Sequence, residues 1–153
     1  MPATACAAAL RAALALTSAL TLASCARPVT TELEFYPSPR PQAVFSPAVR
    51  FGNLLFVSGQ IGTDSTGRVV QGGIQAEGRQ ALNNMQTTLE RYGSSLDRVV
   101  KCTVFLADMK DFQEFNQIYA TYFRARKPAR SAVAVSGLAA NAHVEVECIG
   151  VTS

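Results

Sequence analysis

The chain has 153 residues, of which 48% are hydrophobic and 16% are charged. This composition is typical of a globular protein and excludes an intrinsically disordered one, and the length suits a single domain of ordinary size. The net charge of +3 is slight, and no cluster of basic residues alternates with aromatic ones. The sequence therefore carries no electrostatic signature of a nucleic-acid-binding protein.

The N-terminal residues 1–24 have the pattern of an export signal. An apolar run from Ala12 to Ala23 is too short to span a membrane but suits the central region of a signal peptide. The letters LAS before Cys25 resemble a bacterial lipobox, in which the cysteine thiol is lipidated. The alternative is an ordinary buried or amphipathic helix. We expect an exported protein that is lipid-anchored in the bacterial cell envelope, or a cytoplasmic protein if translation begins after this segment.

Residues 25–42 follow as a proline-rich segment, which predicts a linker between the anchor and a domain over 43–153. Phe35 and Tyr36 are expected to pack on the edge of that domain. Within it, hydrophobic periodicity predicts elements in the order ββ–α–β–α–ββ. Their ranges are Val44–Val57 for the first two strands with a turn at Gly52-Asn53, then Ile74–Tyr92, Arg98–Leu106, a helix beginning at Asp111, Ala129–Ser136 and His143–Val151.

This order predicts an α+β fold with two helices on one face of a mixed sheet. Cys102 and Cys148 fall on the apolar faces of two predicted strands. They read as buried thiols, and a disulfide between them is possible if the chain is exported. No C-x-x-C spacing occurs and His143 is the only histidine, so we expect no structural zinc site. At the end of a turn, His143 reads as a surface residue.

Arg130 is the first candidate functional residue. In the strand after Pro128, alternation places Val133 on one face and Arg130 with Ala132 on the other. Small neighbours leave space beside the guanidinium, which can hold a carboxylate through two parallel hydrogen bonds. The alternative is an arginine in a surface ion pair.

Glu145 is the second candidate, on the polar face of the last strand together with Glu147. It reads either as part of a solvated strand face or as a carboxylate that orients or deprotonates water. If the last two strands form a hairpin, Arg130 and Glu145 share the non-core face about 13 Å apart. That distance suggests a site that borrows residues from a neighbouring subunit.

Three blocks of sequence carry a family resemblance: FSPAVRFGNLLFVSGQIG, PARSAVAV and VEVECIGV. They resemble the RidA family, also called YjgF, of reactive-intermediate deaminases, from about Phe45 to Val151. The resemblance implies a chorismate-mutase-like fold, a homotrimer with clefts between subunits, and hydrolysis of small 2-imino or enamine acids to a 2-oxo acid and ammonia. It implies no metal and no organic cofactor.

The resemblance also implies residue roles, with Arg130 as the carboxylate clamp and Glu145 as the water-positioning group. The implied substrate-binding residues are Phe45, Ser58, Gly59, Asn116, Arg130 and Ala132. Phe45 stands where the family has tyrosine and lacks its hydroxyl, and Ala132 replaces a cysteine. Ser58 has no neighbouring histidine and reads as a hydrogen-bond donor rather than a nucleophile.

Two further classes of function remain open. One is a module of the same family that binds small carboxylates without turnover, and the other is a protein-interaction module. RNA cleavage, which is ascribed to some relatives, gains little support from a nearly neutral chain.

Overall fold

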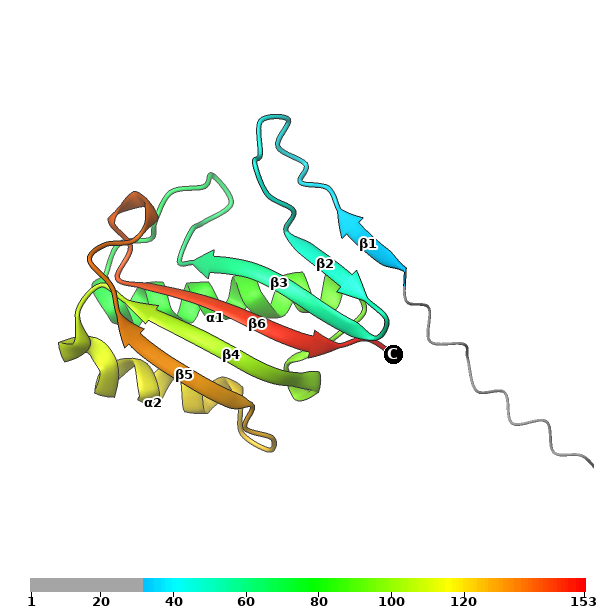
Figure 1. The fold of residues 1–153 in the computed structure, drawn as a ribbon. Helices are drawn as coiled ribbons and strands as arrows, with labels where there is room; N and C mark the ends of the chain where they lie inside the picture. The colour runs from blue at the N-terminus through cyan, green and yellow to red at the C-terminus, as the bar shows by residue number, and fades with distance from the viewer. Residues whose placement is uncertain (1–31) are drawn as a thin grey trace, which may run out of the picture.

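The computed structural model describes residues 32–153, so the predicted signal peptide, Cys25 and the first part of the expected linker lie outside the described residues. The described chain contains six strands, two α-helices and three short 3₁₀ turns (Figure 1). The elements are β1 (Leu33–Tyr36), β2 (Ala48–Phe51), β3 (Leu54–Ile61), α1 (Gly73–Arg91), η1 (Leu96–Arg98), β4 (Val99–Leu106), η2 (Met109–Asp111), α2 (Phe112–Tyr122), β5 (Ala129–Ala134), η3 (Ala139–Asn141) and β6 (Val144–Val151).

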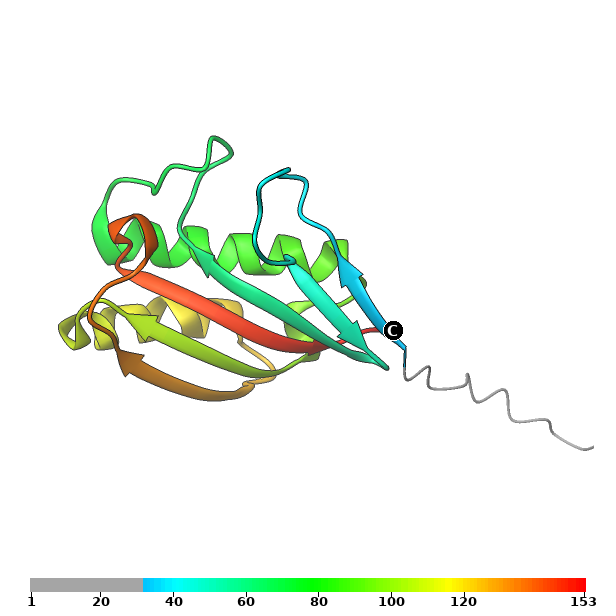
Figure 2. The ribbon, with the colours of Figure 1, turned by 45° about the horizontal axis from the view of Figure 1, so that its top comes forward.

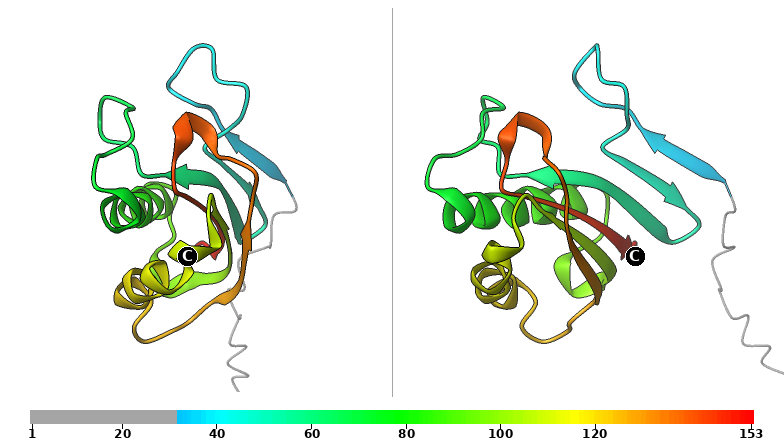
Figure 3. Two further views of the ribbon diagram at one scale, coloured as in Figure 1. Left: turned by 90° about the vertical axis from the view of Figure 1, so that its left-hand side faces the viewer. Right: turned by 60° about the vertical axis from the view of Figure 1, so that its left-hand side comes forward.

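The strands form one sheet in the order β1-β2-β3-β6-β4-β5, in which only β4 and β5 run parallel. Both helices lie side by side against one face of this sheet, and the other face carries no helix (Figures 2 and 3). The predicted α+β architecture of a mixed sheet with two helices on one face is therefore confirmed. None of the helices formed by residues 32–153 has the length and apolarity needed to cross a membrane.

The core fills the space between the sheet and the helices. Strand alternation sends Cys102, Val104 and Leu106 of β4 into it, while α1 and α2 contribute apolar stripes at helical spacing. Gly78 lets the two helices approach closely, since a Cβ there would lie 3.1 Å from side-chain atoms of Ile118. The helix-covered face is thus a packed apolar layer.

Cys102 and Cys148 are bonded to each other in a disulfide inside this layer. They are direct partners across the antiparallel β4–β6 ladder, with their Cα atoms 4.1 Å apart. The sequence left open whether these residues are free thiols, and the structure joins them.

Part of the expected linker is a strand. β1 pairs antiparallel with β2, and Glu34 forms an ion pair with Arg50 across the two strands. Tyr36 stacks on Tyr92 at the end of α1, with ring centroids 4.3 Å apart. The expectation that Phe35 and Tyr36 both pack on the domain edge therefore holds for Tyr36, whereas Phe35 is exposed. The surrounding prolines concealed this edge strand because the partner that completes it lies twelve or more residues further on.

The expected hairpin between the last two strands is wrong. β5 lies at the sheet edge beside β4, and β6 is inserted between β3 and β4. The connection β4–α2–β5 is a strand–helix–strand unit, which makes its two strands parallel. Arg130 is therefore paired with Cys102 and shares the helix-covered face with it, while Val133 lies on the open face, opposite to expectation.

Candidate functional site

Arg130 is held by the helix α2 of its own chain. Its Nη2 donates a hydrogen bond of 2.6 Å to Oδ1 of Asn116. Its guanidinium carbon lies 4.7 Å from the centroid of the Tyr119 ring and 5.8 Å from that of Phe112. These three partners occupy positions i, i+4 and i+7, which share one face of a helix.

This arrangement fixes the plane of the guanidinium. An arginine that stacks on aromatic rings gains about 0.5–2 kcal/mol from cation–π attraction, depending on how far it is desolvated. Among residues 32–153, Nε and Nη1 of Arg130 have no hydrogen-bond partner, so an edge of the fork remains for a ligand. A preoriented planar fork suits bidentate capture of a carboxylate.

Tyr119 and Phe112 contact Arg130 but were not among the site residues expected from the sequence. The signal that identifies them is their shared face with Asn116. The Tyr119 side chain is buried, and its hydroxyl has no hydrogen-bond partner among the described residues. Burial raises the pKa of Tyr119 to about 12, although nearby Arg130 opposes the shift. Tyr119 therefore stays a neutral hydroxyl at physiological pH.

Glu145 lies on the open face of the sheet, at the start of β6. Its carboxylate rests against Gly59, because a Cβ built on that glycine would lie only 1.8 Å from Oε1 of Glu145. The register of the β3–β6 ladder shifts between Val57 and Gln60, so Ser58 and Gly59 form a bulge that makes this room. Burial, and secondarily the charge of Glu147, raise the pKa of Glu145.

Ser58 and Phe45 lie near the same bulge. The Ser58 hydroxyl donates to the carbonyl oxygen of Ser46 at 2.7 Å, and the Ser58 N–H donates to that of Pro47 at 3.0 Å. These bonds fix the segment that carries Phe45, whose ring is exposed. Ser58 was expected to donate a hydrogen bond to a substrate, but in this structure its hydroxyl proton is donated within the chain.

The predicted site residues form two groups. Asn116 and Ala132 lie with Arg130 at the β5 edge, on the helix-covered side of the sheet. Gly59 and Glu145 lie on β3 and β6, and Glu145 pairs with Phe105 on the open face. The expectation that Arg130 and Glu145 share one face is wrong, because β4 separates their strands and their side chains point to opposite sides. One chain alone does not bring these two residues into a single pocket.

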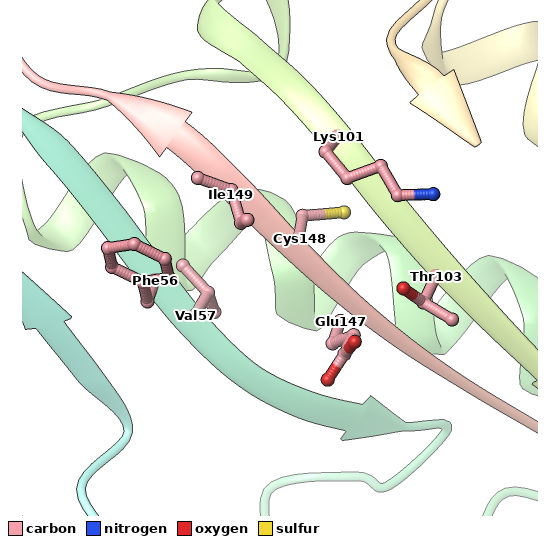
Figure 4. A pocket seen from close by; sticks show the side chains of 7 residues that line it. All are labelled: Phe56, Val57, Lys101, Thr103, Glu147, Cys148 and Ile149. Atoms are coloured by element: carbon pink, nitrogen blue, oxygen red, sulfur yellow. The ribbon is translucent and has the colours of Figure 1, made fainter. Parts of the chain in front are cut away.

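The open face holds a separate small hollow of about 140 Å³ over β3, β6 and β4 (Figure 4). Apolar and charged side chains line it: Phe56, Val57, Lys101, Thr103, Glu147, Cys148 and Ile149. Neither Arg130 nor Glu145 is among these lining residues. Within residues 32–153, no group of three or more His, Cys, Asp or Glu side chains is arranged to hold a metal ion.

Residues 36–152 match a family model described as endoribonuclease L-PSP. The chain belongs to this family, which is the RidA/YjgF family. It is 44% identical over 108 residues to the mouse 2-iminobutanoate/2-iminopropanoate deaminase, with 70% of this chain and 80% of the relative covered. The earlier RidA resemblance is thereby confirmed.

Solved RidA-family structures share the fold. The crystal structure of yeast Mmf1 superposes with a TM-score of 0.75 at 41% identity, covering 80% of this chain and all of that one. E. coli TdcF with bound serine superposes with a TM-score of 0.70 at 31% identity, covering 79% of this chain and 98% of TdcF.

Proposed function

We propose that this RidA-family chain hydrolyses small 2-imino or enamine acids to a 2-oxo acid and ammonia. The observation that carries the proposal is the guanidinium of Arg130, which Asn116 and the Tyr119 ring hold in one orientation with hydrogen-bond donors to spare. Such a group selects a small planar carboxylate. The mouse relative, named as an iminobutanoate and iminopropanoate deaminase, acts on compounds of that class.

The working form in this proposal is a homotrimer with its sites between neighbouring copies. Arg130 and Glu145 lie on opposite faces of the sheet of one chain, so a shared site needs Arg130 from one copy and Glu145 from another. The open face also exposes apolar side chains that an adjacent copy would cover, among them Phe56 and Val133.

The proposed chemistry needs only positioning and proton transfer. Arg130 holds the substrate carboxylate, and ionised Glu145 accepts a proton from the water that attacks the carbon of the protonated imine. Glu145 returns this proton to the nitrogen. The C–N bond then breaks as the carbonyl forms, and the remaining hydroxyl proton passes through Glu145 to the departing ammonia. The net change is iminium plus water to 2-oxo acid plus ammonium. A protonated imine is already electrophilic, so holding the reactants in place supplies much of the acceleration.

A second candidate is a module that binds small carboxylates without turnover. Phe45 favours it, since it stands where the family has tyrosine and offers no hydroxyl to orient a substrate. TdcF with bound serine shows that a relative with this fold takes up a small amino acid.

The deciding experiment uses the purified mature domain with a 2-imino acid generated in situ. Wild type should release the 2-oxo acid faster than buffer, and Arg130→Ala should lose this activity. Arg126→Ala, which removes an exposed arginine from the segment before β5, is the matched control and should retain it. Turnover by wild type no faster than buffer, combined with saturable binding of 2-oxo acids, would support the binding module instead.

We further propose that the chain is exported and anchored through Cys25. The Cys102–Cys148 disulfide supports an oxidising compartment, since disulfides are rare where thiols are kept reduced. Membrane fractionation of the wild type and Cys25→Ser tests the anchor: the wild type should be in the membrane fraction and the variant should not. Equal distribution of the two proteins would remove the lipid anchor from the proposal.

A further inference from the structure

Glu77 is a buried carboxylate in the first turns of α1 that the proposed chemistry does not use. Its side chain is 4% exposed, and both of its oxygens are engaged by one residue, His143. Oε2 accepts the backbone N–H of His143 at 2.7 Å, and Oε1 lies 2.7 Å from the ring nitrogen Nδ1. A carboxylate is costly to bury without such partners, so the buried position of Glu77 depends on its contacts with His143.

His143 is the residue through which the chain enters β6. While its N–H is bound by Glu77, its carbonyl oxygen accepts the N–H of Ala107, which follows β4. Both backbone groups of His143 are therefore fixed, one to a helix and one to the neighbouring strand. Only Val144 separates this anchored residue from Glu145.

The backbone of Glu77 is in contact with the end of β3. Gly62 follows directly on Ile61, the residue that pairs with Glu145. A Cβ on Gly62 would lie 2.6 Å from the backbone of Glu77, so the end of β3 and the first turns of α1 are in direct contact. Glu77 thus contacts both the end of β3 and the start of β6, the two strand ends nearest Glu145.

We propose that Glu77 is a positioning residue for Glu145, acting through its hydrogen bond to the backbone N–H of His143. The bond sets where β6 begins and thereby keeps the Glu145 carboxylate in the Gly59 bulge. The contact to the imidazole ring reinforces this geometry but does not create it. The catalytic part of the inference rests on the proposed deaminase function, whereas the placement of Glu145 does not.

Two classes of variant separate the backbone bond from the ring contact. Glu77→Met keeps the length of the side chain but has no acceptor for the N–H. Glu77→Gln keeps an amide oxygen that can accept it, and His143→Gln keeps the N–H while removing the imidazole. Glu90→Gln changes an exposed carboxylate of the same helix, whose partner is Gln86, and is the matched control.

In the deaminase assay, Glu77→Met should lower kcat about tenfold or more, because small displacements of a reacting group are costly. Its KM should change less than about twofold, since the substrate carboxylate is held by Arg130 of a neighbouring copy and not by Glu145. Glu77→Gln, His143→Gln and Glu90→Gln should keep kcat within about threefold. A loss in Glu77→Gln or His143→Gln as large as that in Glu77→Met would overturn the proposal, as would a fully active Glu77→Met.

A measurement that needs no turnover tests the placement itself. Carboxyl NMR should find the pKa of Glu145 raised in the wild type and in Glu77→Gln, and closer to its ordinary value in Glu77→Met. If wild type hydrolyses no imine, the deaminase function fails while this titration still decides the role of Glu77. If Glu77→Met does not fold, an unshifted Glu145 in folded Glu77→Gln or His143→Gln contradicts the proposal.

Discussion

The two halves of the candidate site differ in how much of their geometry one chain supplies. All the contacts that orient Arg130 come from its own protomer. Helix α2 supplies a hydrogen bond and two aromatic rings, and the residue paired with Arg130 on β4 is Cys102 of the disulfide. The Glu145 carboxylate lies in the bulge at Gly59. Among residues 32–153, no side chain or backbone group forms a hydrogen bond to this carboxylate. The Arg130 group is therefore preorganised within one chain, whereas the position of the Glu145 carboxylate depends on the backbone of β3 and β6.

The difference follows from the two faces of the sheet. On the helix-covered face the inward side chains of the central strands are packed with those of α1 and α2 in one apolar core, so a side chain there is held from several directions. On the open face nothing in the described chain packs over β6 and β4, and side chains are held by the strand alone. Substitutions on the helix-covered face should therefore affect stability and ligand affinity. Substitutions on the open face should affect the reaction rate.

The largest effect is expected on stability, from the disulfide of the helix-covered face. Replacing both Cys102 and Cys148 by alanine should lower the free energy of unfolding by about 2–4 kcal/mol, because the bond restricts an unfolded chain over a sequence separation of 46 residues. Urea denaturation of the oxidised wild type and the double variant measures this. Reduced wild type is the control that keeps both side chains, and equal stability of its oxidised and reduced forms would contradict the prediction.

Arg130→Lys should have the next largest effect. The ammonium keeps the charge but loses the planar fork and its stacking on Tyr119, so kcat/KM for an imino acid should fall about 100-fold. If the chain only binds carboxylates, the same loss should appear in the affinity for 2-oxo acids. Arg126→Lys, an exposed counterpart, should change neither. If Arg130→Lys keeps the kcat/KM or the 2-oxo acid affinity of the wild type, a positive charge without the planar fork is sufficient to hold the carboxylate.

Gly59→Ala tests the open-face half. Its new methyl group would occupy the position of the Glu145 carboxylate, which is a flexible side-chain end and can move away. We expect kcat to fall about tenfold while the melting temperature stays nearly constant. Gly137→Ala, where a methyl group meets no atom within 4 Å, is the matched control. A large loss of stability in Gly59→Ala would mean that the bulge is structural.

The smallest effect concerns pH. Burial and the charge of Glu147 raise the pKa of Glu145, so the rate should rise as this group ionises, through a pKa above the ordinary glutamate value. Glu147→Gln removes the like charge and should move this rise to lower pH. Because the folded state binds the Glu145 proton more tightly than the unfolded chain does, this group's contribution to stability is lost as pH rises through the raised pKa. A rate profile unchanged by Glu147→Gln would exclude the coupling.

The sequence by itself determined the family, both α-helices and every strand except β1. The helical spacing of Leu82, Met85 and Leu89 matches α1, and alternation along residues 99–106 matches β4. Both patterns are local, because the side-chain period depends only on the backbone conformation of the segment itself. The proposed roles of Arg130 and Glu145 rest on the same motifs, through the family resemblance.

Only the tertiary structure decided which face each strand presents and which strands are neighbours. Alternation along residues 129–134 separates Arg130 from Val133 but cannot say which of them meets the helices. That choice followed from β5 pairing parallel with β4 rather than with β6. The contacts between Arg130 and Tyr119 and between Glu77 and His143 depend in the same way on segments distant in the chain, since strand order and helix placement are set by burial of the whole core and not by any one segment.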